Sequence, residues 1–323
     1  STVIQQESIY LRDAVGARLR QSVTDGSGAL AQAARTAGSA NTLLSQDLTP
    51  TLWVQGTGGW GNSFGNGNPA TISSSVGGFF AGLDVAIADN ARAGIVAGFS
   101  RTQFDVDARS SNGSMDNYDI GFYLGAQYGP IGLRGGVSYA WHDVNVGRTV
   151  AFPGFSETND ADYTVGTAQV FGEAGYRISM DAYELEPFAG LAYVNVSGAS
   201  FAESGLGGSA LQVDVGTQNT LYTTLGVRAA TTIQVGGHTL TPSMTLGWQH
   251  AFGDTNSAAN MMFAGGATPF QIQGVPIAED TAILEAGFAY ALSDMATFKV
   301  NYTGQIASEA SQNAFTAQFS LKF

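Results

Sequence analysis

The sequence predicts an all-β membrane protein, a twelve-stranded antiparallel outer-membrane β-barrel preceded by an N-terminal α-helix. Amphipathic segments of strand length recur along the chain, connections alternate between short and long, and a polar helix precedes the first strand. The last nine residues show the first feature most clearly. Phe315, Ala317, Phe319, Leu321 and Phe323 fall on one face of a strand, and Thr316, Gln318, Ser320 and Lys322 on the other.

Composition narrows the class of protein. The 323 residues include 43 glycines, no cysteine and only 12% charged residues, and the net charge is −13. The absence of cysteine suits a chain that crosses an oxidising periplasm, and the acidic balance argues against nucleic acid as a partner. No apolar run reaches the roughly 20 residues that a membrane helix needs. Because no secretory signal stands at Ser1, we expect a processed chain or a fragment.

Residues 2–22 are predicted to form a helix, because they contain good helix formers, no proline and one glycine, Gly16. Charged and amide side chains surround it, including the three arginines Arg12, Arg18 and Arg20, so it is unsuited to lipid contact. A Gly/Ala/Ser/Thr-rich connector follows up to Pro50. We therefore divide the chain into residues 1–50, a helix and connector, and residues 51–323, the barrel.

Twelve candidate strands follow Leu52, and their charges all fall on one face. The predicted inward face carries Asp84, Arg92, Asp119, Arg134, Glu173, Arg177, Glu184, Glu186, Arg228, Glu285, Lys299 and Lys322. The predicted outward face carries none, as a lipid-facing surface requires, since Arg or Lys at mid-bilayer costs about 2–4 kcal/mol. A soluble β-sandwich would also place charges on its solvated face, so this pattern alone leaves that alternative open.

Loop lengths distinguish the two folds better. Short connections are expected near 88–90, 129–130, 179–181, 236–238 and 293–294, and long ones near 62–74, 105–114, 147–163, 199–216 and 253–279, with a shorter sixth near 308–311. Outer-membrane barrels combine short periplasmic turns with longer outside loops. Aromatic residues near strand ends fit the two membrane interfaces: Trp60, Tyr128, Trp141, Tyr176, Tyr183, Trp248 and Tyr290.

Several motifs give the chain a resemblance to the C-terminal translocator domain of monomeric autotransporters (type V secretion). They are residues 11–20 of the helix, 52–60 at the first strand, 82–84, 185–188, 247–254 and 274–280, and their order and spacing span nearly the whole chain. The resemblance implies that the helix lies in the barrel lumen and links a surface passenger to the periplasmic start of the first strand. It implies delivery and anchoring of that passenger. A porin or channel with a plugging helix is the alternative.

The same resemblance implies the partners. These are outer-membrane lipids and lipopolysaccharide, periplasmic chaperones, the chain's own passenger, and the barrel-assembly machinery of a Gram-negative outer membrane, which would read Phe319, Leu321 and Phe323. A monomer is expected.

Catalytic and cofactor chemistry is disfavoured by the sequence. Residues 56–61 match G-x-G-x-x-G, but no βαβ unit follows them, so we predict a glycine-bent strand and no cofactor. The three histidines lack metal-ligand spacing. Glu184 and Glu186 could form an acid–base pair, but we predict that they neutralise arginines, namely Arg12, Arg18, Arg177 or Arg228. Self-cleavage is not favoured, because Asn41 is the only asparagine before the first strand and lies in the connector.

Overall fold

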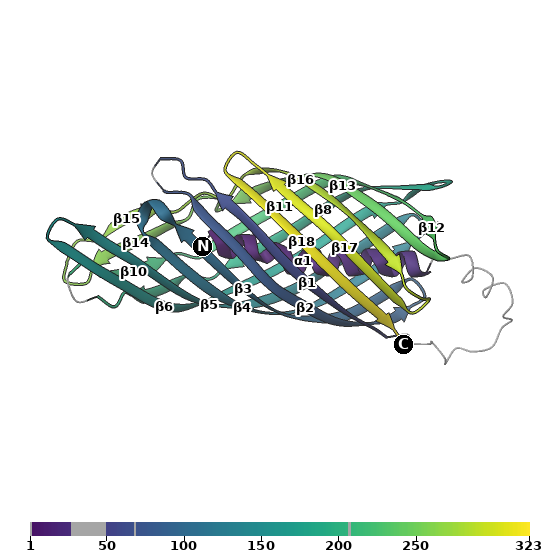
Figure 1. The fold of residues 1–323 in the computed structure, drawn as a ribbon, viewed down its shortest axis with the longest axis horizontal. Helices are drawn as coiled ribbons and strands as arrows, with labels where there is room; N and C mark the ends of the chain where they lie inside the picture. Colours follow the sequence, from purple (N-terminus) through teal and green to yellow (C-terminus); the bar gives the residue numbers. More distant parts are fainter. Residues whose placement is uncertain (1, 27–49, 68, 206–207) are drawn as a thin grey trace.

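The computed structural model describes residues 2–26, 50–67, 69–205 and 208–323, with the backbone alone for residues 22–26. It contains one helix, α1 (Thr2–Gly26), and a barrel sheet (Figure 1). The sheet consists of β1 (Thr51–Ser63), β2 (Ile72–Ala88), β3 (Ala91–Val106), β4 (Ser111–Tyr128), β5 (Ile131–Phe152), β6 (Phe155–Tyr176), β7 (Ile178–Met180), β8 (Tyr183–Val196), β11 (Gln218–Thr231), β12 (Ile233–Val235), β13 (His238–Gly253), β16 (Asp280–Ala291), β17 (Ala296–Ile306) and β18 (Ala310–Lys322).

The sheet closes on itself. Every strand pairs antiparallel with its neighbours, β8 pairs with β11, and β1 pairs with both β2 and β18. The short strands β7 and β12 continue β6 and β11 after a one-residue break, so twelve strands cross the barrel in the described part of the chain. The predicted fold class is confirmed. Closure leaves no strand edge in the barrel, which is what a β-structure in lipid requires.

Both ends of the barrel chain lie at one rim, because Thr51 pairs with Lys322. The five short connections lie at this rim, which we call the turn end, and the longer connections lie at the opposite rim, the loop end. The short connections are as predicted, each spanning two to four residues. Two of the predicted long loops are instead hairpins, since β3 runs to Val106 before β4 begins at Ser111, and only residues 153–154 separate β5 from β6. The strands there extend beyond the amphipathic segment that the sequence revealed.

The remaining long connections also contain structure that the sequence analysis treated as loop. Strands β9 (Ala199–Ala202), β10 (Leu211–Val215), β14 (Ala258–Phe263) and β15 (Phe270–Gln273) form a second sheet in the order β15-β14-β10-β9. This sheet lies at the loop end beside the β5–β6 hairpin (Figure 1). The Arg148–Glu203 ion pair, at 2.6 Å, fastens the hairpin to the β8–β11 connection.

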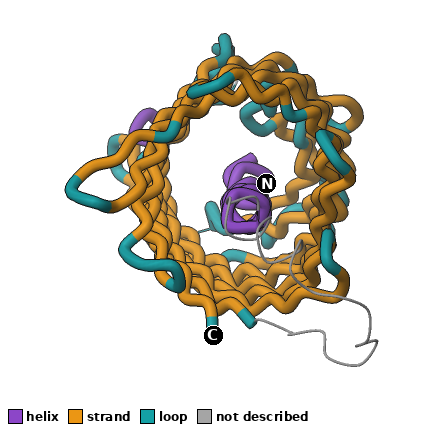
Figure 2. The backbone as a smooth tube through the Cα atoms, turned by 90° about the vertical axis from the view of Figure 1, so that its right-hand side faces the viewer, coloured by secondary structure: helices purple, strands orange, loops and turns teal. Residues whose placement is uncertain are grey.

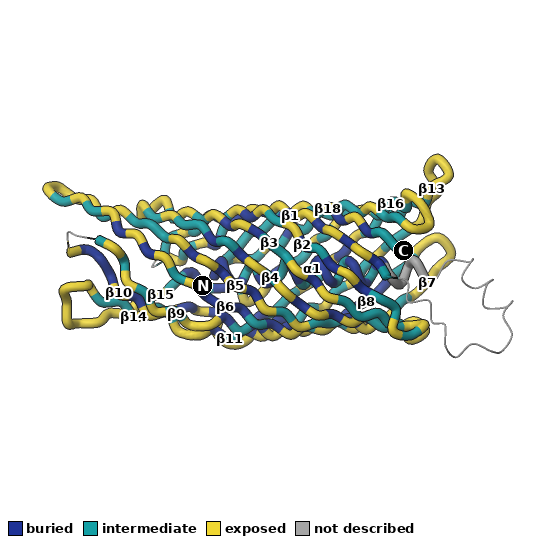
Figure 3. Tube along the Cα trace, turned by 90° about the horizontal axis from the view of Figure 1, so that it is seen from below, coloured by how far each residue is buried: buried dark blue, intermediate teal, exposed yellow. Residues whose placement is uncertain are grey.

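The outer surface of the barrel is an apolar band. Burial alternates residue by residue along the strands (Figure 3), and on β4 the exposed residues Tyr118, Ile120, Phe122 and Leu124 share the outward face. The aromatic side chains predicted at the interfaces are exposed, with Trp60, Trp141 and Trp248 toward the loop end and Tyr128, Tyr176 and Tyr183 toward the turn end, while Tyr290 is half-buried. An apolar band between aromatic girdles is the surface that a bilayer solvates.

The prediction that the outward face carries no charge is wrong beyond this band. Arg101 and Asp116 lie on the outer face, 3.6 Å apart, one step past the Phe99–Tyr118 aromatic pair. Asp143 follows Trp141 on the same face of β5. These charges lie on the strand extensions at the loop end, where water replaces lipid and a charge is no longer costly.

Helix α1 lies inside the ring of strands (Figure 2). It begins as predicted and ends at Gly26, four residues beyond the predicted Ser22. The predicted connector falls on residues 27–49, which lie outside the described residues. In the described part of the chain, no helix is both long enough and apolar enough to cross a bilayer.

The lipid-facing band can be tested with one charge at two heights. Phe122→Arg places a cation on the band and should destabilise the folded barrel by about 2–4 kcal/mol. Ser114→Arg places the same cation on the same face of β4, above the aromatic girdle, and should cost under about 0.5 kcal/mol. Urea titration in lipid vesicles measures both values. Equal losses for the two variants would contradict the assignment of the band.

Candidate functional site: the helix in the lumen

Helix α1 runs from the loop end to the turn end of the lumen. At its start, Thr2 donates a hydrogen bond to the carbonyl of Val275, and Gln6 Nε2 donates to Ser63 Oγ at 2.9 Å, both at the loop end. Near its end, Ser320 Oγ donates to Gln21 Oε1 at 3.0 Å, close to the turn end. The chain preceding the helix therefore points toward the loop end.

One stripe of the helix is apolar, which the sequence analysis overlooked. Leu11, Ala14, Val15 and Leu19 are at most 1% exposed and follow helical spacing. They pack against residues of the barrel wall, namely Trp53, Phe80, Val96 and Tyr123. The i, i+3, i+4, i+8 pattern was legible in the sequence, but the surrounding charges obscured it. The helix therefore packs against one wall of the lumen through apolar side chains.

Asp84 is the centre of the polar contacts at the turn end. Its carboxylate accepts two hydrogen bonds from Arg18 of the helix, at 2.7 and 2.9 Å, and one from Arg92 at 2.6 Å. Tyr123 Oη donates to the same carboxylate at 3.0 Å and accepts from Trp53 Nε1 at 2.7 Å. The Asp84 side chain is fully buried and that of Arg18 is 2% exposed. A bidentate pair with further donors is the arrangement in which buried charges are tolerated.

Two glycines make room for the aromatic members of this network. A Cβ at Gly82 would lie 2.5 Å from the Trp53 ring, and a Cβ at Gly94 would lie 2.4 Å from the Tyr123 ring. Both distances are shorter than carbon atoms allow. The small residues at these positions therefore let the two rings lie flat against the wall beneath the helix.

A second charged cluster joins four adjacent strands. Arg134 Nη1 lies 2.8 Å from both Glu173 and Glu186, and Arg228 lies 2.5 Å from Glu173 and 3.1 Å from Glu186. The Arg228 guanidinium also stacks on the Phe188 ring, 3.6 Å from its centroid. Two cations and two anions thus balance in the lumen, with each carboxylate contacting both arginines.

The two glutamates weighed as a catalytic pair have different partners. Glu186 belongs to the four-residue cluster, and Glu184 lies 2.8 Å from Arg177 near the turn end. Helix residues Arg12 and Arg18, also proposed as their partners, do not contact them in the described structure. Arg18 binds Asp84, whereas Arg12 donates to Gln169 Oε1 at 3.2 Å and lies over the Tyr222 ring. Wall residues rather than the helix hold these glutamates: Arg228 lies directly opposite Glu186 on the paired strand β11, and Arg134 reaches Glu186 across β6.

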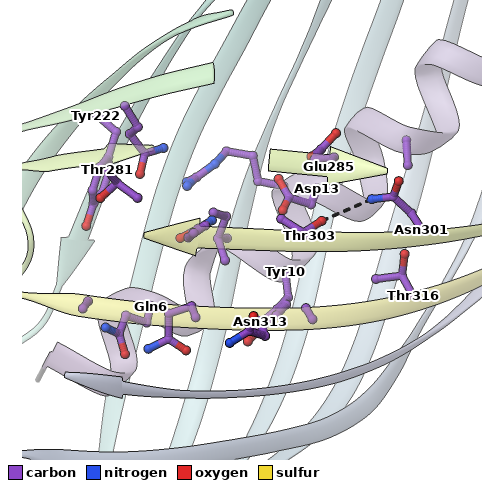
Figure 4. A pocket seen from close by; sticks show the side chains of 18 of the residues that line it. Gln6, Tyr10, Asp13, Tyr222, Thr281, Glu285, Asn301, Thr303, Asn313 and Thr316 are labelled. Carbon is purple, nitrogen blue, oxygen red and sulfur yellow. Dashed lines mark hydrogen bonds between the residues drawn. The ribbon is translucent and has the colours of Figure 1, made fainter. Parts of the chain in front are cut away.

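Beside the helix, two adjoining cavities have volumes of about 90 and 100 Å³. Asp13, Arg20 and Glu285 line both (Figure 4 shows Asp13 and Glu285 in the first). Each has room for a few water molecules. The helix with its side chains therefore fills most of the lumen at this depth.

The lumen also contains a hydrogen-bond network around a buried histidine. His142 Nδ1 lies 2.7 Å from Asn117 Oδ1, and His142 Nε2 lies 2.9 Å from Thr167 Oγ1. Asn117 Nδ2 donates to Ser100 and Thr102. Among the described residues, no group of three or more His, Asp or Glu side chains is arranged to hold a metal ion.

The three C-terminal residues assigned to assembly lie on the outer surface. Phe319 and Phe323 are 42% and 61% exposed, Leu321 is half-buried, and the Phe323 amide donates to the Pro50 carbonyl at 2.9 Å. The last strand thus presents apolar side chains to the membrane side at the turn end.

A closed barrel with an apolar exterior, a polar lumen and an internal helix defines an outer-membrane β-barrel protein. The family model for the autotransporter β-domain matches residues 52–303, and the chain belongs to this family. The chain is therefore a protein of the outer membrane.

Known proteins agree with this assignment. Two extracellular serine proteases of Serratia marcescens are 34% and 32% identical over 317 residues, which is 98% of this chain. The chain spans 29% of the length of each relative. The translocator domain of the autotransporter NalP from Neisseria meningitidis has the same fold, with a TM-score of 0.70, 14% identity and coverage of 100% of this chain and 99% of that one. The β-domain of the Bordetella autotransporter BrkA matches with a TM-score of 0.67 and 19% identity. The match covers 85% of this chain and 100% of that one.

Asp84 should contribute more to stability than any solvent-exposed carboxylate. Asp84→Ala leaves the Arg18 guanidinium buried without its carboxylate, and we expect the free energy of unfolding to fall by about 3–5 kcal/mol. Asp294→Ala removes an exposed carboxylate from a turn and should change it by less than about 0.5 kcal/mol. Both can be measured by urea titration in lipid vesicles with tryptophan fluorescence. A loss for Asp84→Ala as small as that of the control would show that the ion pair is dispensable.

Proposed function

We propose that this chain delivers a passenger, attached before Thr2, to the cell surface and anchors it there. The observation that carries the proposal is the direction of helix α1, which enters at the loop end beside Val275 and leaves toward the turn end, where β1 begins. A passenger that precedes the helix would then emerge on the side of the long hairpins, which faces outward in outer-membrane barrels. The relatives, being more than three times as long as this chain, leave room for such a passenger.

The two halves of the chain have separate roles in this proposal. Residues 1–50 supply the lumen helix and the connector to the barrel, and residues 51–323 supply the membrane anchor. Arg18, held by Asp84, fixes the helix at the turn end, while Arg12 and Arg20 extend from the same helix toward polar wall groups. The balanced lumen charges keep the interior polar without a net excess at the four-residue cluster.

The external partners follow from the outer surface. Lipids and lipopolysaccharide would cover the apolar band and its girdles. The barrel-assembly machinery, with periplasmic chaperones before it, would receive the chain through the exposed apolar face of β18 that includes Phe319, Leu321 and Phe323. Because the strands close within one chain, a monomer suffices.

We assign no catalysis to the barrel. The relatives are named serine proteases as whole proteins, and this chain aligns with 29% of their length, so proteolysis in this family would belong to the passenger. The ion pairs of Glu184 and Glu186 with different arginines support a charge-neutralising role for both. Asn41, the asparagine considered for self-cleavage, lies outside the described residues.

The proposal is tested by joining an epitope-tagged reporter to Ser1, behind a secretory signal, in a Gram-negative host. Protease added to intact cells should remove the tag without lysis, because the helix directs its N-terminal side outward. The matched control carries the tag in the turn at residues 293–294, which should stay protected until the outer membrane is opened. A reporter at Ser1 that is protected like this control would favour the porin alternative.

A further inference from the structure

The polarity of the lumen changes with depth. Toward the turn end, its wall carries the two charged clusters around Asp84 and Glu186. Toward the loop end, inward side chains of the wall form an apolar cluster, which we call the collar. Its members are Met115, Val144, Val165, Ala192, Val194, Val196, Tyr222 and Ala251. Ile72 of β2 and Phe104 of β3 pack against it, so the apolar lining extends from β2 round to β13.

The start of helix α1 fills the space inside the collar. Val3 and Ile4 are buried and belong to the same apolar cluster as the collar residues. Packed apolar side chains of this kind exclude water, and an ion that crossed such a constriction would lose its hydration shell. The collar and the helix start together therefore form a barrier to ions on this side of the lumen.

The remaining strands leave a polar gap in this barrier. In the described chain, β16, β17, β18 and β1 contribute no side chain to the collar. The first cavity lies on this side of the helix, and Thr281, Gln305 and Gln312 line it from β16, β17 and β18. Figure 4 shows Thr281 and, on the helix, Gln6 at this cavity. Because these side chains bind water, closing the loop end here requires another element.

The connection between β15 and β16 lies at the upper end of this cavity. We call its residues 274–278 the strap. Ile277 and Ala278 line the cavity, and Ile277 is only 7% exposed because it packs into the same apolar cluster as Val3 and Ile4. The strap thus brings an apolar side chain to the one side of the loop end that the collar does not cover.

Backbone hydrogen bonds hold the strap in this position. The amides of Gly274 and Ile277 donate to the carbonyls of Ser257 and Thr255, each at 2.8 Å. The carbonyl of Val275, which is 3% exposed, accepts from the Thr2 side chain of the helix. The strap is therefore tied to the β13–β16 connection and to the helix start, and it could open without moving the helix.

We propose that the strap is a lid which, together with the collar, closes the outer mouth of the lumen to small ions. The apolar Ile277 completes the constriction above an otherwise polar cavity, and hydrophobic constrictions exclude ions by excluding water. This barrier is separate from the delivery of a passenger, and the outer membrane would need it whether or not a passenger is attached.

The test is the conductance of the purified barrel in a planar lipid bilayer with potassium chloride. Ile277→Ser removes the apolar side chain of the lid. Ile272→Ser is the matched control, since Ile272 lies in β15 of the same connection, is 45% exposed and does not belong to the collar. We expect Ile277→Ser to raise the conductance about fivefold and Ile272→Ser to leave it unchanged.

Two measurements separate an opened lid from a misfolded barrel or a lost helix. Urea titration verifies that each variant is folded, and a thiol–thiol crosslink between cysteines replacing Gln6 and Ser63 verifies that the helix is in place. Unchanged conductance of such an Ile277→Ser barrel would show that the helix alone seals the lumen. An equal rise in both variants would show a general effect of the connection. Either result would overturn the lid.

Locking the strap provides a second test in the same variant. The chain has no cysteine, so cysteines replacing Thr2 and Val275 can be joined by a short, reducible crosslinker. In the Ile277→Ser barrel, crosslinking should return the conductance toward that of the parent, and reduction should raise it again. A conductance that stays raised after crosslinking would place the ion path elsewhere and contradict the proposal.

Discussion

Lipid offers no hydrogen bonds to a peptide backbone, and the rest of this structure depends on that constraint. The chain satisfies it by pairing β1 with β18 over their full lengths, so that the ring has no open edge. Once the ring is closed, alternate side chains must face lipid or lumen, and the apolar band and the polar interior follow from one pattern. Where strands β3 to β6 rise past the aromatic girdle, charges return to the outer face.

The closed ring creates an interior that must be filled or wetted. Helix α1 occupies this interior and is held by two kinds of contact: the apolar stripe around Leu11 and Val15, and the buried Arg18–Asp84 ion pair. Because breaking a buried pair leaves an uncompensated charge, the pair specifies one depth for the helix. The stripe and the pair face the same side of the barrel, and the first of the two cavities beside the helix lies toward the opposite wall. The helix packs against one side of the lumen. This asymmetric packing both holds the helix in place and leaves the cavities on its other side.

The barrel could be predicted from sequence because its signal is local. The alternation around Ile120 and Phe122 and the two-residue turns each depend on neighbouring residues alone. The prediction that charges face the lumen likewise needed only strand periodicity. The hairpin lengths and the β9–β10–β14–β15 sheet could not be found this way, since strands beyond the membrane lose the apolar face that marks them.

Partners within the lumen depend on which strand lies beside which helix turn. Asp84 was predicted to face inward, but its link to Arg18, 66 residues away, follows from helix depth and barrel shear. The inward orientation of Trp53 was not predicted from the sequence either, because it depends on the strand register that places Trp53 beside Tyr123. Glu186 was expected to meet an arginine, and strand order decides that Arg134 and Arg228 are the ones. Long-range geometry of this kind leaves no periodic trace in a single sequence.

The central claim is that the helix occupies the lumen with its start at the loop end, and a crosslink in intact cells tests it most directly. The chain has no cysteine, so cysteines replacing Gln6 and Ser63 form a unique pair. A short thiol–thiol crosslinker should join them, since Gln6 Nε2 and Ser63 Oγ lie 2.9 Å apart. Cysteines at Gln6 and Ser320, which lie toward opposite ends of the lumen, should stay unlinked. Linkage of the second pair, or of neither, would contradict the account.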